Sequence, residues 1–336
     1  MAPTIAEAPA ASLVSILGDL DQAREIGDQH VLAMRRAFYA NGVISKDEAE
    51  SLLSLDRRLT SQHTSWRQFL AEAVTDYIVH QEQPSGYVTA ENSDWLVSQI
   101  ASDGVVQSRN GIEVLVKVLD QARFAPDSLA RFALEQVRLA VVEGVGPARP
   151  RRGGAVGVVT AEDVDLIRRI IYAFGGDQSL AVSRAEAEIL FAINDKTPEE
   201  LNDPAWSDLF VKAIGSHILA ASGYRPPPRE EALRQDAWLS SRDGVGSFLG
   251  RILQGGTPAI FASYQQQDLE DLELARLERQ RIELVIAEEV SGPEASWLID
   301  RLGSGPLHQN ERALLKFLKA ESARIHPALA GLVEAA

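Results

Sequence analysis

The strongest constraint on the fold is that the two halves of the sequence resemble each other. Tryptophan and tyrosine are scarce, with 5 and 6 copies in 336 residues, yet they recur in register. Trp66 matches Trp206, and Tyr87 matches Tyr224. Further matches pair Arg35-Arg36 and Tyr39 with Arg168-Arg169 and Tyr172, Ser45 and Glu48 with Ser183 and Glu186, and Phe69-Leu70 with Leu209-Phe210. Agreement among so many residues, several of them rare, predicts a domain duplicated in tandem.

The repeat continues beyond residue 90, with an interruption in the second half. Trp95 matches Trp297, although Trp238 also lies at a suitable distance after Tyr224. Both matches hold if residues of about 239–296 are an insert. We therefore expect a disordered N-terminal segment over 1–19, helical repeat domain 1 over 20–144, a Gly/Pro/Arg linker over 145–156, and helical repeat domain 2 over 157–336 with the acidic helical insert.

Hydrophobic periodicity predicts an all-α fold. Apolar residues recur at spacings of three and four over 22–40, 45–57, 63–80, 109–122, 126–143, 161–174, 183–194, 204–221, 264–290 and 308–334. Ser45 with Glu48, and Ser183 with Glu186, have the spacing of a capping box at a helix start. Strand signals are weak, and 155–160 is the only stretch with a β-like composition. The sequence therefore predicts two helical bundle domains.

Composition limits the partners. The chain holds 48 Asp+Glu against 33 Lys+Arg, for a formal charge of −15, which disfavours nucleic acid and anionic membranes. Cysteine is absent, which excludes disulfides, thiolate metal sites and cysteine nucleophiles. Apolar runs are too short to span a bilayer, and the first residues lack the basic and apolar regions of a signal peptide. We expect a cytoplasmic protein that binds another protein or a second copy of itself.

A local pattern recurs near the expected helix starts. A glycine or small residue is followed, after one or two intervening residues, by an aliphatic residue, and a glutamate often lies four positions after the aliphatic residue. The instances are Gly42-Val-Ile44 with Glu48, Gly104-Val-Val106, Ser179-Leu-Ala-Val182 with Glu186, and Gly305-Pro-Leu307 with Glu311. The pattern resembles the second half of an EF-hand calcium loop, and is similar to the helix-loop-helix repeats of TerB-like tellurite-resistance proteins. The resemblance implies EF-hand-like helix-loop-helix units, for which Ca²⁺ would be the cofactor, whereas from the residues themselves we expect no cofactor.

The metal ligands implied by this resemblance are Asp177, Glu186, Asp300 and Glu311. The pattern departs from a calcium loop, which needs oxygen ligands at its first, third and fifth positions. Counting back from Glu48 places Ala37, Tyr39 and Asn41 there, and Leu180 replaces the turn glycine before Glu186. The alternative interpretation is that each glutamate caps a helix by accepting backbone N–H groups, and this interpretation fits the residues better.

Signatures of catalysis are missing from the sequence. The six histidines never fall at the i, i+3 or i+4 spacing that places two metal ligands on one helix face. His217 matches Tyr77 in the repeat, so we interpret it as a half-buried substitute for an aromatic residue. The glycine clusters lack the lysine and the preceding strand of a phosphate-binding loop. We therefore assign no catalytic residue and expect a protein that is not an enzyme.

Three hypotheses for function remain. The first is a non-enzymatic helical adaptor that binds a protein through the insert or through the groove between the copies. Apolar residues along the acidic helix 264–290 would contact the partner, with Leu269, Leu272, Leu277 and Ile282 as candidates. The second is a cation-responsive module descended from EF-hands, and the third is an enzyme of unknown class.

Overall fold

The computed structural model describes residues 13–20, 24–149, 154–173, 182–198, 201–221, 290, 292–303, 307–322 and 325–335. These residues are mostly helical, with few short strands, which confirms the all-α prediction. The chain divides into two compact units, Met1–Gly153 and Gly154–Ala336. The division falls inside the segment 145–156, which the sequence assigns to a linker.

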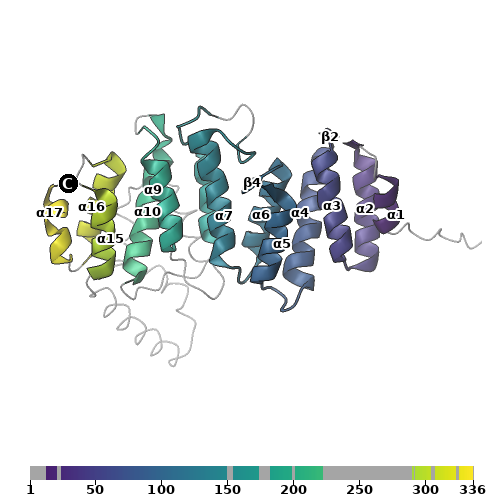
Figure 1. Cartoon of the computed structure of the whole chain (residues 1–336), viewed down its shortest axis with the longest axis horizontal. Helices are drawn as coiled ribbons and strands as arrows, with labels where there is room; N and C mark the ends of the chain where they lie inside the picture. Colours follow the sequence, from purple (N-terminus) through teal and green to yellow (C-terminus); the bar gives the residue numbers. More distant parts are fainter. Residues whose placement is uncertain are drawn as a thin grey trace, which may run out of the picture. The chain divides into compact units, whose positions relative to one another are not determined.

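Unit 1 is built around α4 (Figure 1). Its helices are α1 (Leu13–Asp19), α2 (Asp28–Asn41), α3 (Lys46–Arg58), α4 (Thr64–Thr75), α5 (Ala90–Ile100), α6 (Arg109–Gln121) and α7 (Asp127–Arg138), with π-helical turns η1 (Asp76–Gln81) and η2 (Leu139–Glu143) extending α4 and α7. α4 packs against α2, α3 and α6, and α6 packs against α7. Trp66 and Leu70 on α4 are fully buried, so this helix supplies the centre of the core.

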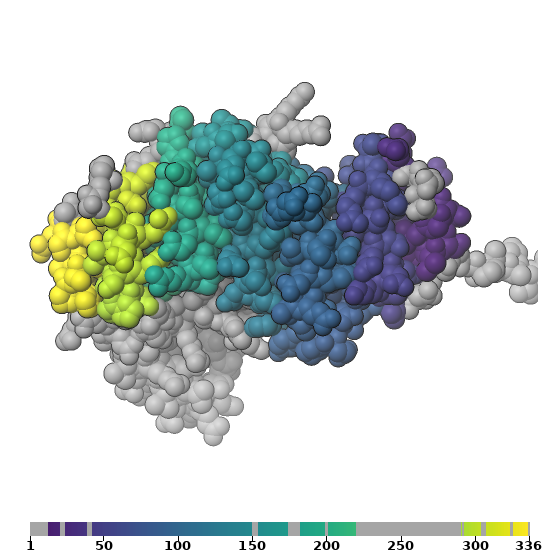
Figure 2. All heavy atoms as spheres, viewed as in Figure 1, coloured from purple at the N-terminus to yellow at the C-terminus, as the bar shows by residue number. Residues whose placement is uncertain are grey.

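In unit 2 the central helix, against which the others pack, is α10. Its described helices are α8 (Ala161–Ala173), α9 (Arg184–Asn194), α10 (Pro204–Ala221), α15 (Gly292–Leu302), α16 (Gln309–Glu321) and α17 (Pro327–Ala335). α10 packs against α8, α9 and α16, and both α15 and α16 contact α17. In Figure 2 the yellow atoms of α17 lie beside the yellow-green atoms of α15 and α16. Trp206 and Phe210 on α10 are fully buried.

Side-chain caps set several helix starts. Ser45 accepts a hydrogen bond from the Glu48 backbone N–H, while the Glu48 carboxylate accepts one from the Ser45 N–H at 2.8 Å. Ser183 and Glu186 form the same reciprocal pair at the start of α9. These capping boxes satisfy N–H groups that have no partner within the helix.

Two short strand pairs were not predicted. β1 (Glu25–Ile26) pairs in parallel with β2 (Ser61–Gln62), and β3 (Ala101–Ser102) forms an antiparallel hairpin with β4 (Val105–Val106). Each strand has two residues, too few for the alternation that identifies a strand in sequence. The β-like stretch 155–160 contains no strand.

The predicted disorder over 1–19 is wrong for residues 13–19. These residues form α1, and its Leu13 and Leu17 side chains are buried. α1 packs against α2 and α3, so the first unit begins before residue 20. Residues 1–12 lie outside the described part of the chain.

Besides α1, two other helices, α5 and α15, were missed by the periodicity analysis. On α5 a buried serine, Ser93, lies among the core-facing positions, which weakens the apolar stripe. α15 shows that residues 292–296 belong to the same helix as Trp297, so the expected insert 239–296 extends too far. The predicted helix 308–334 is two helices, because α16 ends at Glu321 and Pro327 occupies the first position of α17.

Candidate functional site: an arginine-rimmed pocket

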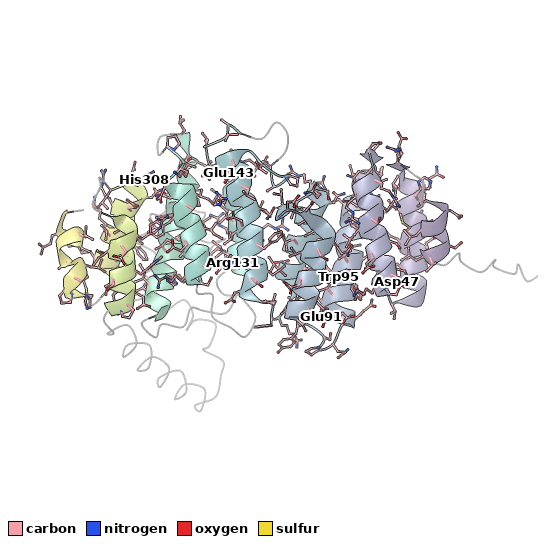
Figure 3. All side chains as sticks on the ribbon, in the orientation of Figure 1. Asp47, Glu91, Trp95, Arg131, Glu143 and His308 are labelled. Carbon is pink, nitrogen blue, oxygen red and sulfur yellow. The ribbon has the colours of Figure 1, made fainter. Side chains whose placement is uncertain are left out.

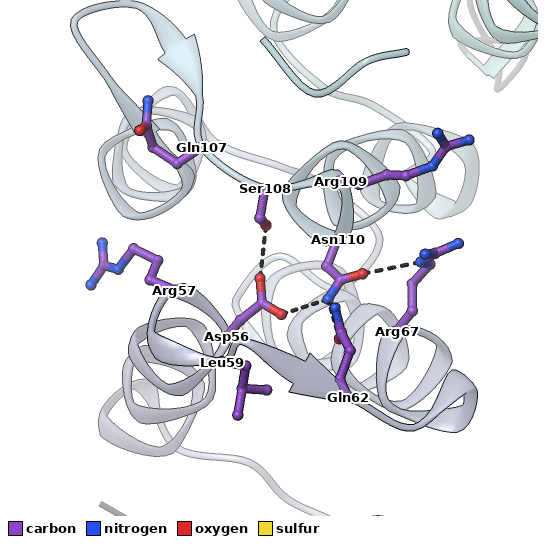
Figure 4. Close-up of a pocket in the computed structure, with 9 residues that line it drawn as sticks. All are labelled: Asp56, Arg57, Leu59, Gln62, Arg67, Gln107, Ser108, Arg109 and Asn110. Carbon is purple, nitrogen blue, oxygen red and sulfur yellow. Dashed lines mark hydrogen bonds between the residues drawn. The ribbon is translucent and has the colours of Figure 1, made fainter. Parts of the chain in front are cut away.

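A polar pocket of about 380 Å³ lies in unit 1 where α3 ends and α6 begins. It is lined by Asp56, Arg57, Leu59, Gln62, Arg67, Gln107, Ser108, Arg109 and Asn110 (Figure 4). The lining residues come from segments that are distant in sequence and that the helix packing brings together. β2 supplies Gln62, and α4 supplies Arg67.

The Asp56 carboxylate forms the floor of the pocket and is buried, with 7% of the residue exposed. Its Oδ1 accepts hydrogen bonds from Trp66 Nε1 at 2.8 Å and from Asn110 Nδ2 at 2.5 Å, and its Oδ2 accepts one from Ser108 Oγ at 2.7 Å. Asn110 Nδ2 also donates to Gln62 Oε1 at 2.7 Å. Neutral donors therefore stabilise the buried carboxylate, which needs such partners to be tolerated in the interior.

Three exposed arginines surround this network. Arg67 donates from Nε to Asn110 Oδ1 at 3.0 Å, and Arg57 donates from Nη1 to the carbonyl oxygen of Gln99 at 3.0 Å. Arg109 makes no hydrogen bond or ion pair with the described residues. Figure 4 shows the guanidinium groups of Arg67 and Arg109 on one side of Asp56 and that of Arg57 on the other.

In unit 2 the equivalent buried positions hold two uncharged residues, with Asn194 at the position of Asp56 and Asn310 at that of Asn110. Asn310 donates from Nδ2 to Asn194 Oδ1 at 2.8 Å, and both residues are buried. Trp206 occupies the position in α10 that Trp66 occupies in α4, and neither its Nε1 nor the Asn194 Nδ2 has a hydrogen-bond partner among the described residues.

The arginine positions differ between the units. Arg57 and Asp195 occupy the same position relative to the N-cap serines of α3 and α9. Asp195 there forms an ion pair with Arg301, its Oδ2 lying 2.8 Å from Arg301 Nη2. The positions of Arg67 and Arg109 hold Ser207 and Gln309 in α10 and α16, so none of the three equivalent described positions in unit 2 is basic.

A second tryptophan arrangement also recurs in both units. Trp95 Nε1 donates to Glu50 Oε1 at 2.8 Å, and Trp297 Nε1 donates to Glu188 Oε1 at 2.6 Å. Tyr77 packs edge-on against Trp95, with ring centroids 5.3 Å apart. In unit 2 the contact comes from His217, whose ring lies edge-on to Trp297 at 5.0 Å, in agreement with the interpretation that this histidine replaces a tyrosine.

Burial governs the titration of these two aromatic residues. Desolvation, followed by the nearby Glu82 and Glu50 carboxylates, raises the pKa of Tyr77 to about 12. Desolvation lowers the pKa of His217, partly opposed by its hydrogen bond to the Val182 carbonyl oxygen at 2.8 Å. Both groups therefore stay neutral at pH 7 and act as packing elements.

The proposed metal ligands are not gathered in the described residues. Glu186 and Glu311 each accept a backbone N–H three residues earlier, from Ser183 and His308, at 2.8 and 2.7 Å. Asp300 lies exposed on α15, and Asp177 lies outside the described residues. No group of three His, Cys, Asp or Glu able to hold a metal occurs in the part of the chain that the structure describes.

The arginine pocket was missed by the sequence analysis. Arg57, Arg67 and Arg109 are separated by other residues and follow no motif, and only the helix packing places them around one cavity. A signal was available in the comparison of the halves, because these three positions are basic in one half and acidic or neutral in the other. The candidate contacts Leu269, Leu272, Leu277 and Ile282 lie outside the described residues and stay predictions.

Comparisons with protein-family models, with curated proteins and with solved structures each found no match to this chain. None of the helices within the described ranges is long and apolar enough to cross a membrane. The resemblance to EF-hand and TerB-like repeats therefore gains no support from relatives, and the functional argument rests on the pocket.

Proposed function

We propose that this protein is a non-enzymatic helical adaptor that binds a protein partner, with the pocket of unit 1 as one contact point. The observation that carries the proposal is the hydrogen bonding of the Asp56 carboxylate. Both oxygens of this carboxylate accept hydrogen bonds from the protein itself, and through Asn110 the carboxylate holds the rim residue Arg67 in place, which is a positioning role. The side chains that face solvent around it are suited to recognition.

We also infer that the two units descend from a tandem duplication. α5 and α15 have equal length, as do α6 and α16, and α4 with η1 spans as many residues as α10. The Trp–Glu hydrogen bonds and the capping boxes recur at equivalent helix positions. Among the described residues the arginine rim occurs in unit 1, and the equivalent positions of unit 2 hold Asp195, Ser207 and Gln309, so the argument for binding rests on this site and not on the shared fold.

The adaptor proposal is tested by affinity capture with the whole chain as bait. The expected result is a protein recovered from extract that then binds the purified chain in a saturable, stoichiometric manner. A bait with residues 257–289 deleted measures the contribution of the insert. The deletion stops before α15, because Trp297 on that helix packs in unit 2.

The control bait is the same chain after heat denaturation. Recovery of the same proteins on folded and denatured bait would contradict the proposal, as would a partner that fails to bind the purified chain. Loss of binding on deletion of 257–289 would assign the contact to the insert. Retention would assign it to the rest of the chain.

A further inference from the structure

We propose that the pocket of unit 1 is an oxyanion-binding site that receives a carboxylate or phosphate group on an acidic peptide segment of the partner. The inference rests on the proposed function and adds the chemistry of the group recognised. Its two central residues are Arg67 and Arg109, which line the same cavity and extend on the same side of Asp56 in Figure 4.

The charge of the pocket opposes that of the chain. The lining holds three arginines against one aspartate, in a protein with a formal charge of −15. By contrast, two arginines elsewhere in unit 1 form ion pairs, Arg35 with Glu72 and Arg138 with Glu135. Arg57, Arg67 and Arg109 have no such partner among the described residues, so their charge is available to a ligand.

The network below the rim fixes part of the site in advance. Arg67 is held through Nε by Asn110, and Asn110 is held by Asp56. The two Nη groups of Arg67 remain able to donate in the paired geometry that matches a carboxylate or phosphate. Arg109 and Asn110 are also the first residues of α6, where the helix dipole favours an anion.

Unit 2 shows that the fold does not require these arginines. Its polar floor is present, with Asn194 and Asn310 in the buried positions, yet Ser207 and Gln309 replace the two central arginines. The arginines are thus an addition to a scaffold that forms without them. A structural role in the core would leave them buried, whereas all three are exposed.

A peptide is the macromolecule that the charges favour. A nucleic acid presents many phosphates and would be repelled by the excess of negative charge over the chain. A short peptide needs to place only one or two acidic groups in a cavity of about 380 Å³. Arginine recognises both carboxylate and phosphate, so the experiment has to distinguish the two sources.

The test is a fluorescence anisotropy titration of the full chain with three labelled decapeptides of one backbone sequence. One carries glutamates, the second carries phosphoserines at those positions, and the third carries unmodified serines. We expect saturable binding of at least one acidic peptide and none of the serine peptide. The double variant Arg67→Gln and Arg109→Gln is expected to weaken that binding at least tenfold, and the binding is expected to weaken as salt rises.

The control is Arg131→Gln, which removes one exposed arginine from α7 and is expected to leave binding within twofold (Figure 3). Circular dichroism checks that each variant is folded. Equal binding by wild type and the double variant would overturn the proposal, and so would a wild-type chain that binds neither acidic peptide. In either case partner capture by the folded chain is measured separately, so the adaptor proposal can survive the failure of the anion site.

Discussion

Replacement of Asp56 by alanine tests whether the buried hydrogen-bond network holds unit 1 together. The substitution removes the acceptor of three hydrogen bonds at once. The largest cost falls on Trp66, because this residue is fully buried and its Nε1 has no other hydrogen-bond acceptor among the described contacts. Asn110 keeps its bond to Gln62, and Ser108 is only partly buried and can turn to water.

The expected cost follows from these differences. An unpaired buried donor costs about 1–3 kcal/mol, and a hydrogen bond to a charged acceptor contributes about 1.5–3 kcal/mol. With the full cost falling on Trp66 and a partial cost on the other two donors, we expect Asp56→Ala to lower the free energy of unfolding by about 2–4 kcal/mol. Asp56→Asn keeps one acceptor oxygen, as Asn194 does in unit 2, and is expected to cost about 1 kcal/mol.

The assay is urea unfolding of the whole chain, followed by tryptophan fluorescence and circular dichroism. Each variant is paired with Asp94→Ala, which removes an exposed carboxylate from α5 and is expected to change stability by less than about 0.5 kcal/mol. A double-mutant cycle between Asp56→Ala and Trp66→Phe isolates the shared hydrogen bond. We expect a coupling free energy of about 1–2 kcal/mol.

Two results would refute the reasoning. The first is an Asp56→Ala variant as stable as the Asp94→Ala control. The second is a coupling near zero, which would mean that Trp66 does not depend on the carboxylate for its hydrogen bond.

Three further predictions concern unit 2 and the capped loops. Gly215→Ala should lower the stability of unit 2 by about 1–3 kcal/mol, because a Cβ at this position would overlap the Phe317 ring. Gly331→Ala should raise the stability of α17 by about 0.5–1 kcal/mol, because a Cβ there has open space around it. Thermal melts measure both changes. Desolvation raises the pKa of the buried Glu321 carboxyl. This carboxyl therefore binds a proton more tightly in the folded chain than in the unfolded chain. The free energy of unfolding falls as the pH rises from the ordinary pKa of a glutamate through the raised pKa of Glu321. In unit 1 the equivalent position, the last residue of α6, is Gln121. Glu321→Gln should therefore raise the free energy of unfolding at pH 7 by on the order of 1 kcal/mol and change it little at pH 4. Titration with millimolar Ca²⁺ should give no binding heat in calorimetry, because the loop glutamates accept backbone N–H groups at helix starts.

Each of these has a distinct contrary outcome. Equal melting temperatures for the two glycine variants would show that the Phe317 ring moves aside at little cost. A Glu321→Gln variant with the same advantage at pH 4 and pH 7 would remove the carboxylate titration as the cause. A saturable calcium isotherm that a chelator abolishes would show that the capping glutamates exchange partners for a metal.

The all-α class could be predicted from the sequence because long amphipathic segments and capping boxes are local signals. Ser45 and Glu48 are three residues apart, and their contact needs no tertiary information. α5 was missed for the opposite reason, since Ser93 is buried by packing that local sequence does not reveal. The break between α16 and α17 was missed because apolar spacing continues across it, although a proline such as Pro327 is typical of a first helical turn.

The candidate site could not be predicted because it is assembled from distant segments. The bond between Asn110 and Asp56 joins residues 54 apart, and the bond between Arg67 and Asn110 joins residues 43 apart. No motif spans such separations. Glutamates at the helix starts, by contrast, suggested a calcium loop through spacing alone, whereas Asp300 lies within a helix and Glu311 accepts a backbone N–H.

The Trp–Glu hydrogen bond spans different sequence separations in the two units, and this difference affects the order in which the units fold. In unit 1 it joins Trp95 to Glu50 across 45 residues, and in unit 2 it joins Trp297 to Glu188 across 109. Closing the longer separation costs an unfolded chain about 0.8 kcal/mol more. On a ribosome, the first Trp–Glu pair can form before the tryptophan of the second has been synthesised. The N-terminal unit would therefore be the earlier one to resist proteolysis as the nascent chain emerges.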